Sequence, residues 1–113
     1  MQLVYKIMTR SDYQKGLGAG AFPIAAVDAR DGYTHLSSAE QAPETARLHF
    51  AGAGALVALA FDADAMGEAL KWEPSRAGAL FPHFYGVLDP ARVVSAHTIA
   101  EDQEGVWRLG AAE

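Results

Sequence analysis

Apolar and polar residues alternate at the start of the chain, which is the pattern of a strand with one buried face. Between residues 3 and 8, Val4, Lys6 and Met8 share one side, and the other three share the opposite side. A second apolar run, residues 55–61, does not alternate and is bounded by glycine and aspartate. A strand buried on both faces needs no polar positions, so we predict a central strand over this run.

Two helices are predicted in the N-terminal half of the chain. The first begins after Thr9, where the run Thr-Arg-Ser-Asp offers a helix cap, and glycines end it before residue 22. The second has Pro43 in its first turn, where the missing N–H costs nothing, and it ends near Gly52. A capping box before the second helix is predicted from Ser37 or Ser38 with Glu40 or Gln41.

Much of the remaining chain is predicted to be extended. Residues 22–27 are expected to be extended and to lead into a tight turn at Asp31-Gly32. Many strands with two helices near the start are typical of the α+β class, and the length suits a single domain over residues 1–113. The other strands that we predict cover residues 33–38, 71–73, 83–87, 93–99 and 105–109.

Charge and composition restrict the kinds of partner. Nine Lys and Arg stand against fourteen Asp and Glu, which gives a formal net charge of -5. The basic residues are scattered, so we expect no bulk nucleic acid as a partner, although one nucleotide-sized ligand needs only one or two cations. The chain has no cysteine, and its four histidines lack zinc-ligand spacing, so we expect no metal site.

The sequence also bears on location. Its first residues read as a strand and not as a signal peptide, and no apolar run is long enough to cross a bilayer. We therefore expect a cytoplasmic protein without membrane contact. The oligomeric state does not follow from the sequence.

Residues 70–88 combine polar and aromatic side chains with two prolines, as the wall of a ligand pocket does. Glu73 and Arg76 are three residues apart, and a pair this close most often forms an ion pair that holds a loop. Alternatively, Glu73 binds a sugar hydroxyl or stabilises an electron-poor carbon, and Arg76 meets a phosphate in a forked contact. Trp72 faces the other side of this strand and is predicted to lie in the core.

Two histidines are further candidates. His83 is predicted to project from a strand together with Tyr85, as an acid or base beside a phenol that donates to a ligand. His35 is predicted to share one strand face with Tyr33 and Ser37, which would form a row for ligand binding. Structural alternatives stay open, in which the Tyr85 hydroxyl is hydrated and His35 bonds a nearby carbonyl at the strand end.

Six separated stretches of the sequence carry a family resemblance: residues 4–7, 31–37, 40–41, 44–46, 70–76 and 80–86. Together they resemble the bacterial domain-of-unknown-function 952 family, over nearly the whole chain up to about Val94. That family has no established activity and is grouped by fold similarity with the ADP-ribosyltransferase-like proteins. The resemblance implies an α+β fold in which two small, mostly antiparallel sheets face a cleft that holds NAD or ADP-ribose.

The resemblance also implies roles for individual residues. His35-Leu36-Ser37 is similar to the early-strand motif that binds the ribose of the adenosine half in those proteins. Tyr85 resembles the tyrosine that stacks on nicotinamide, and Glu73 is the carboxylate available for transferase chemistry. The RNA 2'-phosphotransferases of this fold use several arginines, of which Arg76 is a counterpart.

We therefore expect a nucleotide-type pocket that binds NAD or ADP-ribose, with transfer or hydrolysis at the ribose if the protein is an enzyme. The alternative is a catalytically inactive module that binds another small molecule or a peptide. It is favoured by the order of Glu73 and Tyr85, which is the reverse of the order usual in the ADP-ribosyltransferases, and by the lack of a second carboxylate. The expected ligand-binding residues are His35, Ser37, Arg76 and Tyr85, and the expected catalytic residues are Glu73 and His83.

Overall fold

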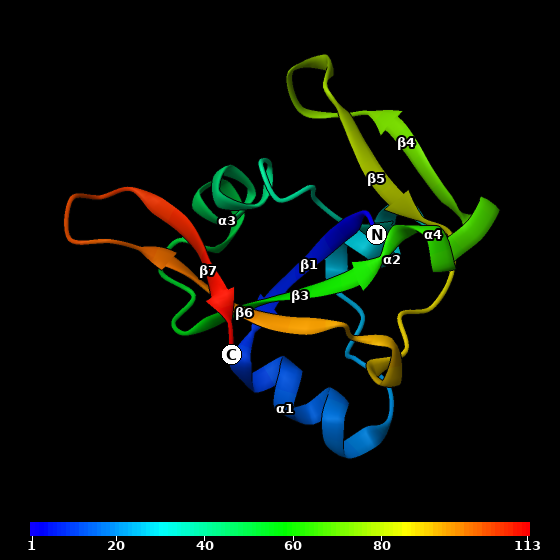
Figure 1. Ribbon diagram of the computed structural model, residues 1–113, viewed down its shortest axis with the longest axis horizontal. Coiled ribbons are helices and arrows are strands. Elements are labelled where there is room, and N and C mark those ends of the chain that lie inside the picture. The colour runs from blue at the N-terminus through cyan, green and yellow to red at the C-terminus, as the bar shows by residue number, and fades with distance from the viewer.

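The computed structural model describes residues 1–113 and contains two antiparallel sheets with helices beside them (Figure 1). The strands are β1 (Leu3–Thr9), β2 (Thr34–His35), β3 (Leu56–Asp62), β4 (Leu70–Pro74), β5 (Leu80–Phe84), β6 (Ser95–Glu101) and β7 (Trp107–Ala112). One sheet has the order β1-β3-β6-β7 and the other has the order β2-β5-β4. The α+β class with two antiparallel sheets is confirmed.

The helices are short, and the two longest lie in the N-terminal half, as expected. The α-helices are α1 (Arg10–Ala19), α2 (Ala26–Asp31), α3 (Ala42–Phe50) and α4 (Ala63–Met66). Three 3-10 turns follow: η1 (Gly67–Ala69), η2 (Arg76–Gly78) and η3 (Pro90–Arg92). No helix is both long and apolar enough to pass through a membrane.

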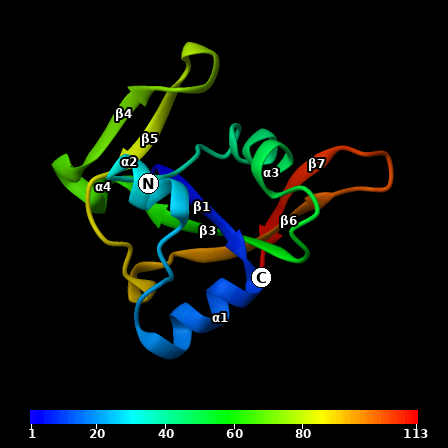
Figure 2. The same ribbon diagram turned by 180° about the vertical axis from the view of Figure 1, so that it is seen from behind.

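The four-stranded sheet carries the core, and β3 at its centre is buried at every position but the last. Alternate side chains of β3 belong to two clusters on opposite faces. Leu59 lies in the cluster that Tyr13 of α1 covers, and Ala58 lies in the cluster that contains Ala42 and Ala46 of α3. Figures 1 and 2 show α1 and α3 on opposite sides of this sheet. The central strand predicted from the unbroken apolar run is confirmed.

Local capping signals in the sequence also hold. The Thr9 side chain accepts a hydrogen bond from the Asp12 N–H at 3.1 Å and caps α1. Among the candidates for the capping box before α3, Ser38 and Gln41 form the reciprocal pair of bonds. The Gln41 N–H donates to Ser38 Oγ at 3.2 Å, and the Ser38 N–H donates to Gln41 Oε1 at 3.0 Å. These bonds depend on residues three positions apart, which is why the sequence alone predicts them.

Three local predictions are wrong. The extended segment at 22–27 ends earlier, because α2 begins at Ala26 and Asp28 is held there by partners far away in the sequence. The strand predicted at 83–87 lies at Leu80–Phe84 instead, and Pro82 is inside it, where its carbonyl accepts from the Leu36 N–H at 3.0 Å. Trp72 is 37% exposed and lies outside the core clusters, because β4 is an edge strand with largely exposed side chains.

The segment from β2 to Ser37 joins the two sheets. His35 of β2 pairs with His83 of β5, and Ser37 pairs with Tyr5 of β1 two residues later. The Tyr5 N–H donates to the Ser37 carbonyl at 2.7 Å, and the Ser37 N–H donates back at 2.9 Å. The residues next to this junction therefore come from both sheets.

Candidate functional site

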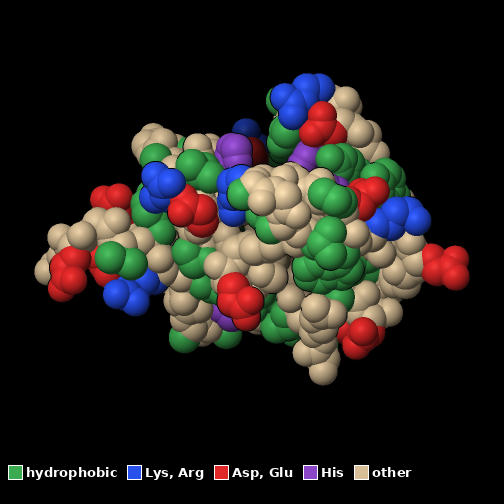
Figure 3. Space-filling model, turned by 90° about the horizontal axis from the view of Figure 1, so that it is seen from above, with side chains coloured by type: hydrophobic (Ala, Val, Ile, Leu, Met, Phe, Trp, Pro, Cys, Tyr) green, Lys and Arg blue, Asp and Glu red, His purple; other side chains and the backbone are tan.

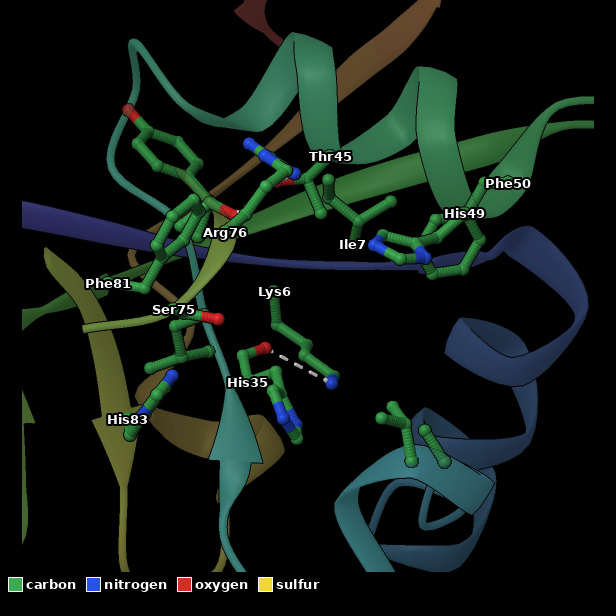
Figure 4. A pocket seen from close by; sticks show the side chains of 15 residues that line it. Lys6, Ile7, His35, Thr45, His49, Phe50, Ser75, Arg76, Phe81 and His83 are labelled. Atoms are coloured by element: carbon green, nitrogen blue, oxygen red, sulfur yellow. Dashed lines mark hydrogen bonds between the residues drawn. The ribbon is translucent and has the colours of Figure 1, made fainter. Parts of the chain in front are cut away.

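A cavity of about 340 Å³ lies at the junction of the two sheets, beside α3 (Figure 4). Its size falls near the lower end of the range for small-molecule sites, which is roughly 300–1,000 Å³. In Figure 4, His35 and His83 lie on neighbouring strands at one end, and Arg76 and Thr45 lie near α3. The lining residues are Tyr5, Lys6, Ile7, Ala25, Val27, His35, Leu36, Ser37, Thr45, His49, Phe50, Ser75, Arg76, Phe81 and His83.

The cavity lining is basic, although the chain as a whole has a net charge of -5. No Asp or Glu is among the fifteen lining residues. In the view from above, histidine side chains flank a hollow on both sides (Figure 3). An acidic protein thus contains a cavity lined by basic residues and by no acidic ones. The basic lining residues are Lys6, His35, His49, Arg76 and His83.

Two aspartates behind the cavity wall hold His35 and Lys6. Asp28 Oδ1 lies 2.8 Å from His35 Nδ1 and accepts from the His35 backbone N–H at 3.0 Å. Lys6 Nζ donates to Asp28 Oδ2 at 2.7 Å, and His35 Nε2 lies 2.9 Å from Asp31 Oδ2. Burial by itself raises the pKa of Asp28, but the charge of Lys6 and the hydrogen bonds from Lys6 and His35 hold it below its usual value. His35 therefore bonds carboxylates, and not the carbonyl considered from the sequence.

His83 is the most deeply buried ionisable side chain of the site, at 3% exposure. Its Nδ1 lies 2.9 Å from Glu73 Oε1, and the Tyr85 hydroxyl donates to the same oxygen at 2.7 Å. His83 Nε2 is buried and has no hydrogen-bond partner. The ring of Tyr33 packs edge-on against His83 at 4.2 Å between centroids and stacks on Tyr85 at 5.2 Å. The histidine is thus fixed from behind while one of its nitrogens remains free.

The same contacts set the ionisation of Glu73 and Tyr85. Hydrogen bonds from Tyr85 and then from His83 lower the pKa of the Glu73 carboxyl, because they stabilise its charged form. The hydrogen bond to Glu73 raises the pKa of the Tyr85 hydroxyl to about 12. At neutral pH, Glu73 is therefore a carboxylate and Tyr85 is a neutral donor.

Arg76 has no carboxylate partner, and the predicted ion pair with Glu73 is wrong. Its guanidinium lies 4.8 Å from the centre of the Phe81 ring, and Nη1 donates to Thr45 Oγ1 at 3.4 Å. The physical reason is the chain path: β4 continues to Pro74 and η2 then turns, which separates the two side chains. Most of the guanidinium donors remain available to a ligand.

Ser37 lines the cavity, but its hydroxyl is engaged with α3. The Thr45 hydroxyl donates to the Gln41 carbonyl at 3.1 Å, so Ser37 Oγ, 3.0 Å away, must donate to Thr45 Oγ1. Thr45 thus accepts from both Ser37 and Arg76. This arrangement ties α3 to the junction of the sheets.

Four of the six residues proposed from the sequence line one cavity, and Glu73 and Tyr85 lie behind His83. Lys6 was not proposed, although a lysine between Val4 and Met8 on one strand face is a visible signal for a buried cation. No sequence signal distinguishes Asp28, which acts through contacts distant in the chain. No group of three or more His, Asp or Glu side chains is placed to hold a metal ion.

Comparisons with known proteins agree with this architecture. The model of the family described as "Protein of unknown function (DUF952)" matches residues 7–96. The X-ray structure of protein CC0527 from Caulobacter crescentus is 44% identical, with a TM-score of 0.84 over 94% of this chain and 93% of that one. Its solution NMR structure is 45% identical, with a TM-score of 0.79 over 94% and 91% of the two chains. No curated protein matches the chain.

Proposed function

The chain belongs to the DUF952 family, whose description names no activity, and we propose from the geometry that its cavity binds a nucleotide-type organic anion. NAD and ADP-ribose are the candidates that the family resemblance favours. The observation that carries the proposal is Arg76, a guanidinium without a carboxylate partner in a lining that contains no Asp or Glu.

The lining offers separate contacts for the parts of such a ligand. Arg76, free of any carboxylate, presents a planar fork of donors that suits a phosphate. Ile7, Phe50 and Phe81 supply apolar surface for a base. Lys6 contributes less, because Asp28 already neutralises its charge.

The architecture supports a further part of the proposal, namely that the fold is of the ADP-ribosyltransferase-like type. Two antiparallel sheets meet at the segment His35-Leu36-Ser37, and that segment lines the cavity. A crystal structure with bound ADP-ribose tests this directly. Density against His35 and Ser37 is expected, and a ligand bound elsewhere on the chain would contradict the assignment.

Binding without cleavage is the activity that the geometry favours. Stabilising the positive charge that develops when a ribosyl bond breaks requires a carboxylate close to the sugar, and none lines the cavity. Glu73, the carboxylate considered for this role, already accepts hydrogen bonds from His83 and Tyr85. Incubation with labelled NAD distinguishes the two activities: NAD should stay intact, and release of nicotinamide that stops in Glu73→Gln would show an enzyme.

Calorimetric titration with ADP-ribose, NAD, AMP and inorganic phosphate tests binding itself. We expect heat with at least one nucleotide, and we expect Arg76→Ala to weaken that affinity by about tenfold or more, as loss of a charged hydrogen bond does. Arg92→Ala is the matched control, since Arg92 is exposed and does not line the cavity. The absence of heat with every nucleotide at millimolar concentration, or equal affinities for the two variants, would refute the proposal.

A further inference from the structure

His83 Nε2 is a buried polar atom without a partner in a molecule that satisfies its other buried side-chain polar atoms. Buried polar groups in folded proteins nearly always have a hydrogen-bond partner, and an exception calls for a physical reason. This one belongs to a side chain that lines the cavity. A ligand in the cavity would supply the missing partner.

The surroundings of His83 decide which partner fits. A carboxylate only accepts hydrogen bonds, so His83 Nδ1, 2.9 Å from Glu73 Oε1, carries a proton, and in the neutral form of the ring Nε2 then carries none. Tyr85 donates to the same Glu73 oxygen at 2.7 Å and holds the carboxylate in place. In that form Nε2 carries a lone pair without a partner, on a ring that lines the cavity. The ligand atom that meets it must be a hydrogen-bond donor.

The cavity restricts the donor further. An ammonium group is disfavoured beside the Arg76 guanidinium, which has no carboxylate partner, and a fully ionised phosphate oxygen carries no proton to donate. The donor is therefore a neutral group on an anionic ligand. Ile7 and Phe50, which offer surface to a base, lie away from His83 in Figure 4. A sugar hydroxyl consequently suits the His83 end of the cavity better than the amine of a base.

We propose that His83 Nε2 accepts a hydrogen bond from a hydroxyl group of the bound anion, so that the cavity selects ribonucleotides and related sugar phosphates over their deoxy analogues. This inference rests on the proposed function and names the class of ligand. His83 is a specificity-determining residue in contact with the ligand. Glu73 and Tyr85 are positioning residues that act through it.

The test compares the affinities of AMP, 2'-deoxy-AMP and 3'-deoxy-AMP for the whole protein by calorimetry. At least one deoxy compound is expected to bind about tenfold or more weakly, because a site built around a buried acceptor rejects a ligand that lacks the donor. Inosine monophosphate, whose base lacks the amine of adenine, tests the alternative that this amine is the donor. Selection against inosine monophosphate with no selection against either deoxy compound would overturn the proposal.

Single-residue variants distinguish a loss of the preference for AMP from a loss of folding. His83→Phe should bind AMP and the disfavoured deoxy compound equally, and His83→Gln, which keeps an acceptor near the position of Nε2, should restore part of the preference. Glu73→Ala acts on a partly exposed residue, so it should fold and still reduce the preference several-fold. Glu68→Ala, at an exposed neighbouring carboxylate, should leave the preference unchanged. An unchanged preference in Glu73→Ala would exclude the positioning role.

Nitrogen-15 NMR of the histidine rings provides a readout that does not depend on variants. In the free protein, His83 should carry its proton on Nδ1, and AMP should shift the Nε2 resonance more than the disfavoured deoxy compound does. Equal affinity for AMP and both deoxy compounds, with Arg76→Ala still weakening AMP, would overturn this inference and leave the proposed function standing. Failure of every nucleotide to bind would overturn both.

Discussion

The two sheets of this small domain differ in the interactions that hold their strands. In the four-stranded sheet, apolar clusters cover both faces of β3, and hydrocarbon packing holds the strands. In the three-stranded sheet, β4 is largely exposed, and β5 carries a buried histidine that bonds a carboxylate. The core clusters lie on the first sheet, and the second sheet contributes His35 and His83 to the cavity. The cavity forms where the two meet.

The largest loss of stability is expected from breaking the ion pair between Lys6 of β1 and Asp28 of α2. Asp28 also bonds His35 of β2, so this pair connects the two sheets. Lys6→Met leaves Asp28 buried without its cation, which should lower the free energy of unfolding by about 3–5 kcal/mol. Urea denaturation measures this loss. Lys71→Met, at an exposed lysine of β4, is the control and should change stability by less than about 0.5 kcal/mol. The double variant Lys6→Met, Asp28→Asn should regain part of the loss, and equal effects of the two lysine variants would contradict the connecting role.

A second comparison sets a core leucine against a surface one. Leu59→Ala empties a fully buried position of β3 and should cost about 2–5 kcal/mol. Leu80→Ala, at a 52% exposed position of β5, should cost under about 1 kcal/mol in the same denaturation experiment. Equal losses would show that the three-stranded sheet carries more of the packing energy than its burial indicates.

The smallest effect is expected at the edge of the site. Tyr85→Phe keeps the ring stacked on Tyr33 but removes the hydrogen bond to Glu73, with only a small loss of stability, because the bond is exposed. That bond is the largest cause of the lowered Glu73 pKa, so the variant should move this pKa back toward its usual value. Carboxyl carbon-13 NMR across an acid titration measures the change, and an unmoved Glu73 titration would remove Tyr85 from the network.

The difference between residues that line the cavity and residues that support them explains which parts of the site could be predicted. His35, Ser37, Arg76 and His83 were proposed from local residue types and a family resemblance, and all four line the cavity. The placement of Glu73 behind His83 was not predicted, because it depends on the pairing of β4 with β5. No spacing along the chain indicates whether a side chain points into a cavity or supports the one that does.

What the sequence determined by itself is local: the buried central strand, the cap at Thr9, the box formed by Ser38 and Gln41, and the α+β class. These features depend on residues a few positions apart and on the exclusion of apolar side chains from water. Tertiary structure alone decided that Asp28 meets Lys6 and His35, and that His83 keeps a free nitrogen. The contacts of Asp28 join residues 7 and 22 positions apart, and only the packing of the two sheets brings them together.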